Sequence, residues 1–380
     1  MQLRGAATIP AIEDALRSLA SANVRERLKL PSHIRHVVGG GDAALAQLAI
    51  TWAQTRPEPI LETFIESDVQ IEDFVRRLTG LVAALCSRDV LQLRGGGSIG
   101  EAVRNAALAR LAILQSGKPS GAFRGSSVEI PCIDHLGKDS PYLLCSPVAG
   151  EEPRLRPRSA FTELASYLLG RTVPGPYKRY IGEETPEALG NMIFELFKNT
   201  QDHGQVDDQG NMPAVSVRAV KTLHYGIRTD HLQDMVADYP ALARFCQSLR
   251  PPRGAKQTHV FELSVLDSGP GFAVSRLQRP LAAIGREEEE EAVKDCFTAF
   301  SAKGSSRFGQ GLPHVLRLLA REGGFLRLRT GRVSLHADFS GNDDLPPAQR
   351  LECYLPENCE RLAPVSGSLM TVLIPLRRDE

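Results

Sequence analysis

Residues 193–204 read IFELFKNTQDHG, and this stretch sets Glu195, Asn199 and Asp202 at spacings of four and three residues. Residues at these spacings lie on one face of an α-helix, and bulky apolar residues hold most of the remaining positions. A polar stripe among apolar side chains is costly unless it meets a polar partner. The pattern therefore predicts a buried helix that ends near Gly204 and presents a polar face to a binding site.

The bulk composition is that of an ordinary globular chain. Its 380 residues suggest roughly two or three domains, and its hydrophobic content of 42% and charged content of 24% are typical. The formal net charge is zero, which argues against a general nucleic-acid-binding or membrane-binding surface. No run approaches ~20 apolar residues and the N-terminus lacks a signal-peptide pattern, so we expect a cytoplasmic protein without a membrane partner.

The cysteines and histidines give no metal-binding pattern. The seven cysteines are odd in number and form no Cys-x-x-Cys pair, and Cys353 and Cys359 are too far apart for a common zinc spacing. Free thiols in a reducing compartment are therefore expected. His203 lies two helical turns from Glu195 with no third ligand in view, so we interpret it as a favourable charge at the end of the helix.

The first part of the chain mixes helical and strand-like segments. Residues 1–150 predict an α/β domain of unknown role, regulatory or partner-binding, which a Pro- and Arg-rich linker at 149–159 would end. Within this part, GGGSIG at 95–100 fits the pattern Gly-x-Gly-x-x-Gly. A dinucleotide site also needs an acid about twenty residues further on, which is missing, so a plain strand-to-helix turn is expected.

Two glycine stretches stand out in the second half. VLDSGPGF at 265–272 leads from a strand into Asp267, Gly269 and Gly271. A carboxylate at a strand end can accept a hydrogen bond from a ligand, while the glycines let the backbone approach it. GSSRFGQGL at 304–312 places glycines directly before a helix, where backbone amides form a ready phosphate site.

In their order along the chain, these segments resemble the motifs of the GHKL ATPase superfamily. This superfamily includes type II topoisomerases, ninety-kilodalton heat-shock chaperones, sensor histidine kinases and mismatch-repair ATPases. Its motifs are Glu-x-x-x-Asn-x-x-Asp on a helix, Asp-x-Gly-x-Gly after a strand, and Gly-x-Gly-Leu before a helix, the last found at Gly309, Gly311 and Leu312. GSLMTVLIP at 367–375 fits the last strand of the family, with Ser368 in place of Thr.

The resemblance covers residues 160–380 and implies a Bergerat-type α/β sandwich, in which helices cover one face of a mixed sheet. Insertions are expected near 222–256 and 336–352. A lid over the nucleotide is expected at 272–308, where REEEEE would repel a triphosphate unless it faced solvent at the start of a lid helix. With few apolar anchors, such a lid should be mobile without ligand.

The resemblance also assigns roles to individual residues. Asn199 would hold Mg²⁺, and Glu195 would act as the general base on the attacking water. Asp267 would accept the adenine amino hydrogen, with help from Ser368. The residues expected to bind ATP are Asn199, Asp202, Asp267, Gly269, Gly271, Lys303, Gly304, Arg307, Gly309, Gln310, Gly311, Leu312 and Ser368.

The implied function is that of a slow Mg-dependent ATPase that works as a nucleotide-driven switch in a regulatory or signalling system. A protein partner or a second copy would bind at the lid or the N-terminal domain, and no nucleic-acid partner is expected. A protein kinase is one alternative, since FELFKN and FGQGLP resemble pyruvate dehydrogenase kinases locally. A histidine-kinase-like acceptor at His33 is disfavoured because Ile34 stands where an acid is expected. A non-hydrolysing nucleotide-binding scaffold is the other alternative, although it would not need Glu195.

Overall fold

The computed structural model describes most of the chain. It leaves out residues 1–7, 33–37, 117–126, 138–140, 149–150, 208, 229–235, 237–238, 250, 252–256, 299–310, 342–343, 358 and 377–380. The expectations at His33, Lys303, Gly304, Arg307, Gly309 and Gln310 therefore lie outside the described residues. The described part combines α-helices with a large antiparallel sheet, which confirms the expected α/β class.

The centre of the molecule is a seven-stranded sheet in which every described pairing is antiparallel. Its strands, in spatial order, are β11 (Glu352–Cys353), β10 (Val333–Asp338), β9 (Phe325–Gly331), β12 (Val365–Leu376), β8 (Thr258–Asp267), β7 (Arg218–Ile227) and β4 (Ser127–Cys132). The expectation of a mixed sheet is wrong for this large sheet. The described parallel pairs belong to a separate, smaller sheet. Since β4 precedes residue 150, the large sheet extends across the expected division between the two halves.

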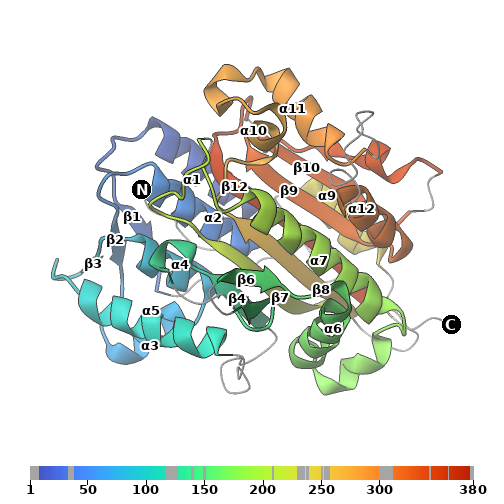
Figure 1. Cartoon of the computed structure of the whole chain (residues 1–380), viewed down its shortest axis with the longest axis horizontal. Helices are drawn as coiled ribbons and strands as arrows, with labels where there is room; N and C mark the ends of the chain where they lie inside the picture. Colours follow the sequence, from blue (N-terminus) through green and yellow to red (C-terminus); the bar gives the residue numbers. More distant parts are fainter. Residues whose placement is uncertain are drawn as a thin grey trace.

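One face of the large sheet is covered by helices from the second half of the chain. They are α6 (Arg158–Thr172), α7 (Thr185–His203) and α12 (Gly311–Arg321), which Figure 1 shows on the viewer's side of the sheet. α6 and α12 both pack against α7. α7 is the helix that residues 193–204 predict, and its apolar residues Leu189, Ile193 and Phe197 are buried.

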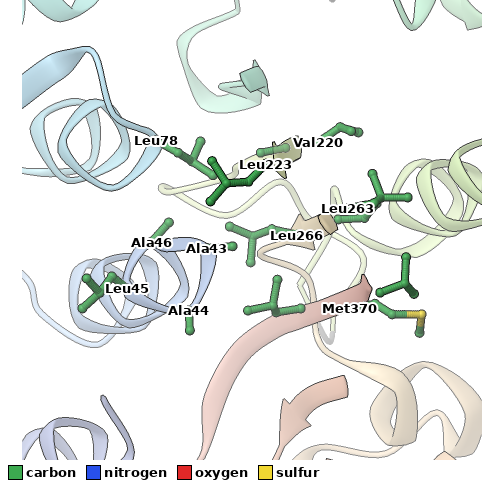
Figure 2. Packing of buried hydrophobic residues seen from close by; sticks show 14 of the residues in the cluster. Ala43, Ala44, Leu45, Ala46, Leu78, Val220, Leu223, Leu263, Leu266 and Met370 are labelled. Carbon is green, nitrogen blue, oxygen red and sulfur yellow. The ribbon is translucent and has the colours of Figure 1, made fainter. Parts of the chain in front are cut away.

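The opposite face of the sheet is covered by helices as well. They are α1 (Ile9–Ser21), α2 (Gly41–Gln54), α4 (Leu78–Cys86) and α9 (Pro240–Ser248). α2 is buried from Gly41 to Ala53, as expected of a helix that is apolar on nearly all sides. Figure 2 shows Ala43 of α2 facing Leu223 of β7 and Leu266 of β8. The architecture therefore has three layers, whereas the sequence predicted helices on one face only.

The start of α2 is fitted closely to the sheet. Gly40 has a φ of +84°, and a Cβ atom there would lie 2.3 Å from the Thr371 hydroxyl of β12, so only glycine fits. The backbone N–H groups of Gly39 and Gly40 each donate a hydrogen bond of 2.9 Å to the Glu262 carboxylate of β8. Burial raises the pKa of Glu262 to about 7, and these two bonds oppose that rise. The N-terminal half is thus anchored on the same strand that ends at Asp267.

The small sheet is parallel and belongs to the N-terminal half. Its strands are β1 (Leu28–Leu30), β2 (Ile60–Thr63) and β3 (Asp89–Gln92), with α2 joining the first two and α3 (Asp68–Val75) and α4 joining the last two. Helical crossovers are what parallel strands require. The expectation of a mixed α/β N-terminal part is confirmed. GGGSIG forms a turn, closed by Gln92 N–H donating to Gly97 O at 2.9 Å, before α5 (Gly100–Gln115).

Three expected connections contain regular structure. The expected linker at 149–159 includes β6 (Glu151–Leu155), which pairs with β5 (Cys145–Val148), and the start of α6. The expected insertion at 222–256 overlaps β7 through Ile227 and then contains α9. The expected insertion at 336–352 overlaps the end of β10 and a short helix, η6 (Pro347–Arg350). The helical pattern near 228–250 predicts a helix in the second of these segments, whereas β6 is not apparent from the Pro- and Arg-rich composition around it.

A pair of stacked histidines predicts that the protein loses stability in mild acid. His224 and His259 lie on neighbouring strands with ring nitrogens 3.1 Å apart, and the Tyr177 ring stacks on His259 at a centroid distance of 3.8 Å. Burial, together with the neighbouring His259, lowers the pKa of His224 to about 4. In the unfolded chain His224 binds a proton below about pH 6.5, whereas in the folded protein it stays neutral down to about pH 4. The free energy of unfolding should therefore fall by about 1–2 kcal/mol between about pH 7 and pH 5.

Urea unfolding at several pH values measures this loss. His224→Phe keeps an aromatic ring in the stack but removes one titrating group, so its stability should depend less steeply on pH than that of the wild type. Equal slopes for the two proteins would show that the histidine pair does not control acid stability.

Candidate functional site

A cavity of about 330 Å³ opens between α7 and the ends of β8 and β12. The helix α10 (Phe272–Leu277), the end of α11 (Arg286–Asp295) and the start of α12 complete its walls. Its lining residues are Leu196, Asn199, Thr200, His203, Val265, Asp267, Gly271, Phe272, Ser275, Arg276, Asp295, Cys296, Thr298, Gly311, Leu312, Ser368 and Met370. Residues from four distant sequence motifs therefore meet in one cavity.

Asp267 is the buried carboxylate of this cavity. It ends β8, and it accepts hydrogen bonds from the backbone N–H groups of Gly269, at 2.9 Å, and Ser368. Burial raises the pKa of Asp267 to about 6, while these two bonds and the charge of Arg218 oppose the rise. Ser368 lies opposite Asp267 in the register of β8 and β12, and its hydroxyl lies 3.0 Å from that of Thr330.

The glycines after Asp267 are needed for packing around the cavity. A Cβ atom on Gly269 would lie 2.6 Å from the His203 carbonyl oxygen at the end of α7. Gly271 has a φ of +84°, and a Cβ atom there would lie 2.8 Å from the Thr330 hydroxyl. The loop can therefore pass between α7 and β9 only with glycine at these positions. Gly269 shapes the loop but does not itself line the cavity.

α7 presents the expected polar face to the cavity over part of its length. Asn199, Thr200 and His203 line the cavity. Asp202 does not, because it points to the surface and pairs with Lys198 one turn earlier on the helix. Burial lowers the pKa of His203, although the nearby Asp202 opposes this. His203 is the last residue of α7, and the interpretation as a charge at the helix end stays a prediction.

Glu195 lies between α6 and the start of α12. Its carboxylate accepts a hydrogen bond from the guanidinium of Arg158, which also donates to Asn191 at 3.0 Å and covers the Phe194 ring at 4.6 Å. The other carboxylate oxygen would lie 2.5 Å from a Cβ atom on Gly311. Glu195 thus lies beside the start of α12 but does not itself line the cavity, and Arg158 binds its carboxylate.

The second glycine stretch is described only at its end. Gly311 and Leu312 begin α12 and line the cavity, so the N-terminus of α12 adjoins this space. The unpaired backbone N–H groups and the dipole of a helix N-terminus favour an anion. The structure therefore brings a buried carboxylate and an anion-favouring helix start to one cavity.

The segment expected to be a mobile lid is partly anchored. Residues 272–298 include α10, the short helix η5 (Leu281–Ala283) and α11. Val293 of α11 and Phe297, just after it, are buried. Glu289 is also buried and accepts hydrogen bonds from the backbone N–H and Nε of Arg332 at 2.6 and 2.5 Å. The expectations of few apolar anchors and of acids that all face solvent are wrong over these residues, because helical spacing turns Glu289 inward.

Sequence reasoning missed the arginine that supports Asp267. Arg218 of β7 is paired in register with Asp267, and its side chain is only 1% exposed. It donates two hydrogen bonds of 2.9 Å to Asp134, and it lies over the Phe197 ring of α7. A charged residue in a strand usually faces solvent, so the pattern VSVRAV gave no signal of this role. Arg158, the first residue of α6, was also missed, because its partner Glu195 lies 37 residues further along the chain.

Comparison of the chain with protein-family models, curated proteins and solved structures found no match. Among the described residues, no helix has the length and apolarity needed to cross a membrane. The same residues contain no cluster of three or more His, Cys, Asp or Glu side chains suited to holding a metal ion.

Proposed function

We propose that this chain is a Mg-ATP-binding ATPase of the GHKL type with a Bergerat-type nucleotide fold, and that it works as a nucleotide-driven switch. The observation that carries the proposal is the position of Asp267, a buried carboxylate in a cavity that also adjoins the N-terminus of α12. A carboxylate suits an amino group of a base, and a helix N-terminus suits phosphates. The cavity lies within the range of about 300–1,000 Å³ usual for ligand sites.

The residues fit Mg-ATP in their chemistry. Asn199 offers an amide oxygen, which is a hard ligand of the kind Mg²⁺ accepts, and Mg²⁺ commonly keeps waters and phosphate oxygens as its other ligands. Asp267 would accept the adenine amino hydrogen, and Ser368 stands beside it on β12. Glu195 lies near Gly311, where the phosphates would end, and could take the proton of the attacking water.

One contact favours the non-hydrolysing scaffold as a second candidate. Arg158 binds the carboxylate of Glu195, so one of its oxygens is already used. Only the other oxygen is left to accept a proton from the attacking water. The comparison of Glu195 variants described in the Discussion separates these two functions.

ATP with Mg²⁺ should stabilise the wild-type protein and fail to stabilise Asp267→Asn. Ligand at about a hundredfold excess over its dissociation constant adds about 2.7 kcal/mol to the free energy of unfolding. The asparagine keeps the shape of the side chain. It faces the adenine amino group either with its NH₂ group, which cannot accept a hydrogen bond, or with its uncharged carbonyl oxygen, which is a weaker acceptor than a carboxylate. Thermal unfolding with and without Mg-ATP measures the effect. Asp14→Asn, on the exposed face of α1, is the control, and an unchanged shift in Asp267→Asn would refute the adenine assignment.

Adenosine should bind more weakly as the pH falls through about 6. The pKa of Asp267 is about 6 in the free protein, and only the ionised carboxylate is a full acceptor for the amino group. Adenosine is a better probe than ATP because it has no phosphate that titrates in this range. Calorimetric titrations at several pH values between about 5 and 8 measure the dissociation constant. A constant affinity across this range would contradict the role of Asp267.

A further inference from the structure

Three polar side chains form a stripe on α2, a helix that is otherwise almost entirely apolar. Gln47, Thr51 and Gln54 are four and three residues apart and therefore share one face of the helix. Gln47 and Thr51 are almost completely buried, at 2% and 4% exposure. Buried polar groups are costly unless they are hydrogen-bonded, so their partners indicate why they are there.

The partners are backbone atoms, and two of the residues that carry them lie beside the candidate base-binding residues: Ser268 in the loop after β8, and Ser366 at the irregular start of β12. Gln54 Nε2 donates to the carbonyl oxygens of Ser268, at 3.0 Å, and Val215, at 2.8 Å. The Thr51 hydroxyl accepts from the backbone N–H of Ser366 at 3.0 Å. Gln47 Nε2 donates to the carbonyl oxygen of Ser366 at 3.3 Å and to that of Arg329 at 3.2 Å.

These contacts reach the cavity only through the backbone on either side of it. Ser268 directly follows Asp267, and Ser366 precedes Ser368 by two residues. The loop after β8 and the start of β12 are also joined to each other, since Gly367 N–H donates to Gly269 O at 2.8 Å. Gln47, Thr51 and Gln54 do not line the 330 Å³ cavity themselves. They hold the loop after β8 and the start of β12 from the opposite face of the sheet.

We infer that Gln47, Thr51 and Gln54 are positioning residues for the base-binding side of the nucleotide cavity. This inference rests on the proposed function. It makes α2, and hence the N-terminal half, part of the nucleotide site instead of a separate regulatory module. A change in the position of α2 would mainly displace the Asp267 carboxylate and the Ser368 hydroxyl. It would displace the start of α12, on the phosphate side, less.

Two isosteric variants of α2 contacts test the inference. Thr51→Val removes the acceptor of the Ser366 N–H. Thr79→Val removes another buried hydroxyl bound to α2. That hydroxyl lies 2.5 Å from the Asp42 carboxylate and 2.8 Å from the Asp42 carbonyl oxygen, near the start of the helix. We expect Thr51→Val to bind a non-hydrolysable ATP analogue about five- to tenfold more weakly, as for the loss of one hydrogen bond, and Thr79→Val to bind it like the wild type. Thr51→Ser should restore binding.

The second readout uses a probe without a base. Tripolyphosphate should bind equally to wild type, Thr51→Val and Gln54→Leu, while the analogue binds more weakly to both variants. Thermal unfolding of all variants records the stability change separately from the affinity change.

The possible outcomes are distinct. Equal weakening by Thr51→Val and Thr79→Val, or equal weakening for both probes, would show that α2 acts on stability alone and would overturn the inference. Unchanged analogue binding by Thr51→Val and Gln54→Leu would overturn it as well. A wild-type protein that binds neither probe would overturn the proposed function, and this inference with it.

Discussion

Glu195→Gln should bind Mg-ATP as tightly as the wild type and release phosphate about 10²–10⁴-fold more slowly, because loss of a general base removes this factor. Glutamine keeps the length of the side chain and can still accept a hydrogen bond from Arg158, so the site should stay folded. It cannot take a proton from water near neutral pH. Phosphate release under single-turnover conditions, together with an analogue dissociation constant, separates the rate effect from binding.

The control for this experiment lies on the same helix. Glu187 is exposed in the first turn of α7, so Glu187→Gln should match the wild type in both binding and rate. Equal and low phosphate release by the wild type and Glu195→Gln, with tight binding in both, would support the scaffold. Radiolabelled phosphate retained on the protein or on a partner would support a kinase instead.

The sequence was most informative about the elements that form the cavity. The spacing of polar residues within an apolar run predicted α7, and the carboxylate before two glycines predicted the end of β8. These signals are local, because helix periodicity and turn chemistry are set by neighbouring residues. Asp202 shows the limit of such reasoning. It has the right spacing, yet α7 ends at His203, where Asp202 turns to solvent and pairs with Lys198.

The arrangement of α2 could not be predicted in the same way. A helix that is apolar on nearly all sides is recognisably buried, but its sequence does not say which surface covers it. Its partners lie far away in the chain, as in the contact of Gln47 with Ser366. Buried charges were misread for a related reason. Arg218 is paired with Asp134, and Glu289 is paired with Arg332. In both pairs the two residues lie far apart in the sequence.

The contacts behind the sheet restrict how a nucleotide-driven switch could work. Glu13 of α1 is buried and accepts hydrogen bonds from Arg329 of β9 at 2.9 and 3.1 Å. Glu262 of β8 binds the start of α2. Undocking the N-terminal half would break these buried pairs and would expose to water the apolar surfaces of α2 and the sheet, which is unfavourable. A switch is therefore expected to act through small changes in the loops and lid, with the N-terminal half remaining attached.

The largest effect on stability is expected at Lys221, which joins three elements of this interface. Its side chain is 1% exposed, and it donates to Glu129 of β4 at 2.7 Å and to Asp42 of α2. Burial lowers the pKa of Lys221, but the two carboxylates outweigh this and raise it overall. The amine therefore stays charged in the folded protein, and the stability it contributes is lost only as the pH rises above about 10.4.

Lys221→Met should lower the free energy of unfolding by about 3–5 kcal/mol, because it leaves Asp42 and Glu129 buried near each other without their cation. Methionine fills a similar volume, so the loss would arise from charge and not from a cavity. The control is Lys29→Met, which breaks a partly exposed pair with Glu62 and should cost at most about 1 kcal/mol. Urea unfolding at neutral pH measures both. If Lys221→Met proves too unstable to purify, Asp42→Asn tests the same cluster through a smaller change. A loss at Lys221 no larger than that at Lys29 would show that this charge cluster does not hold the N-terminal half on the sheet, and would again allow undocking as the switch.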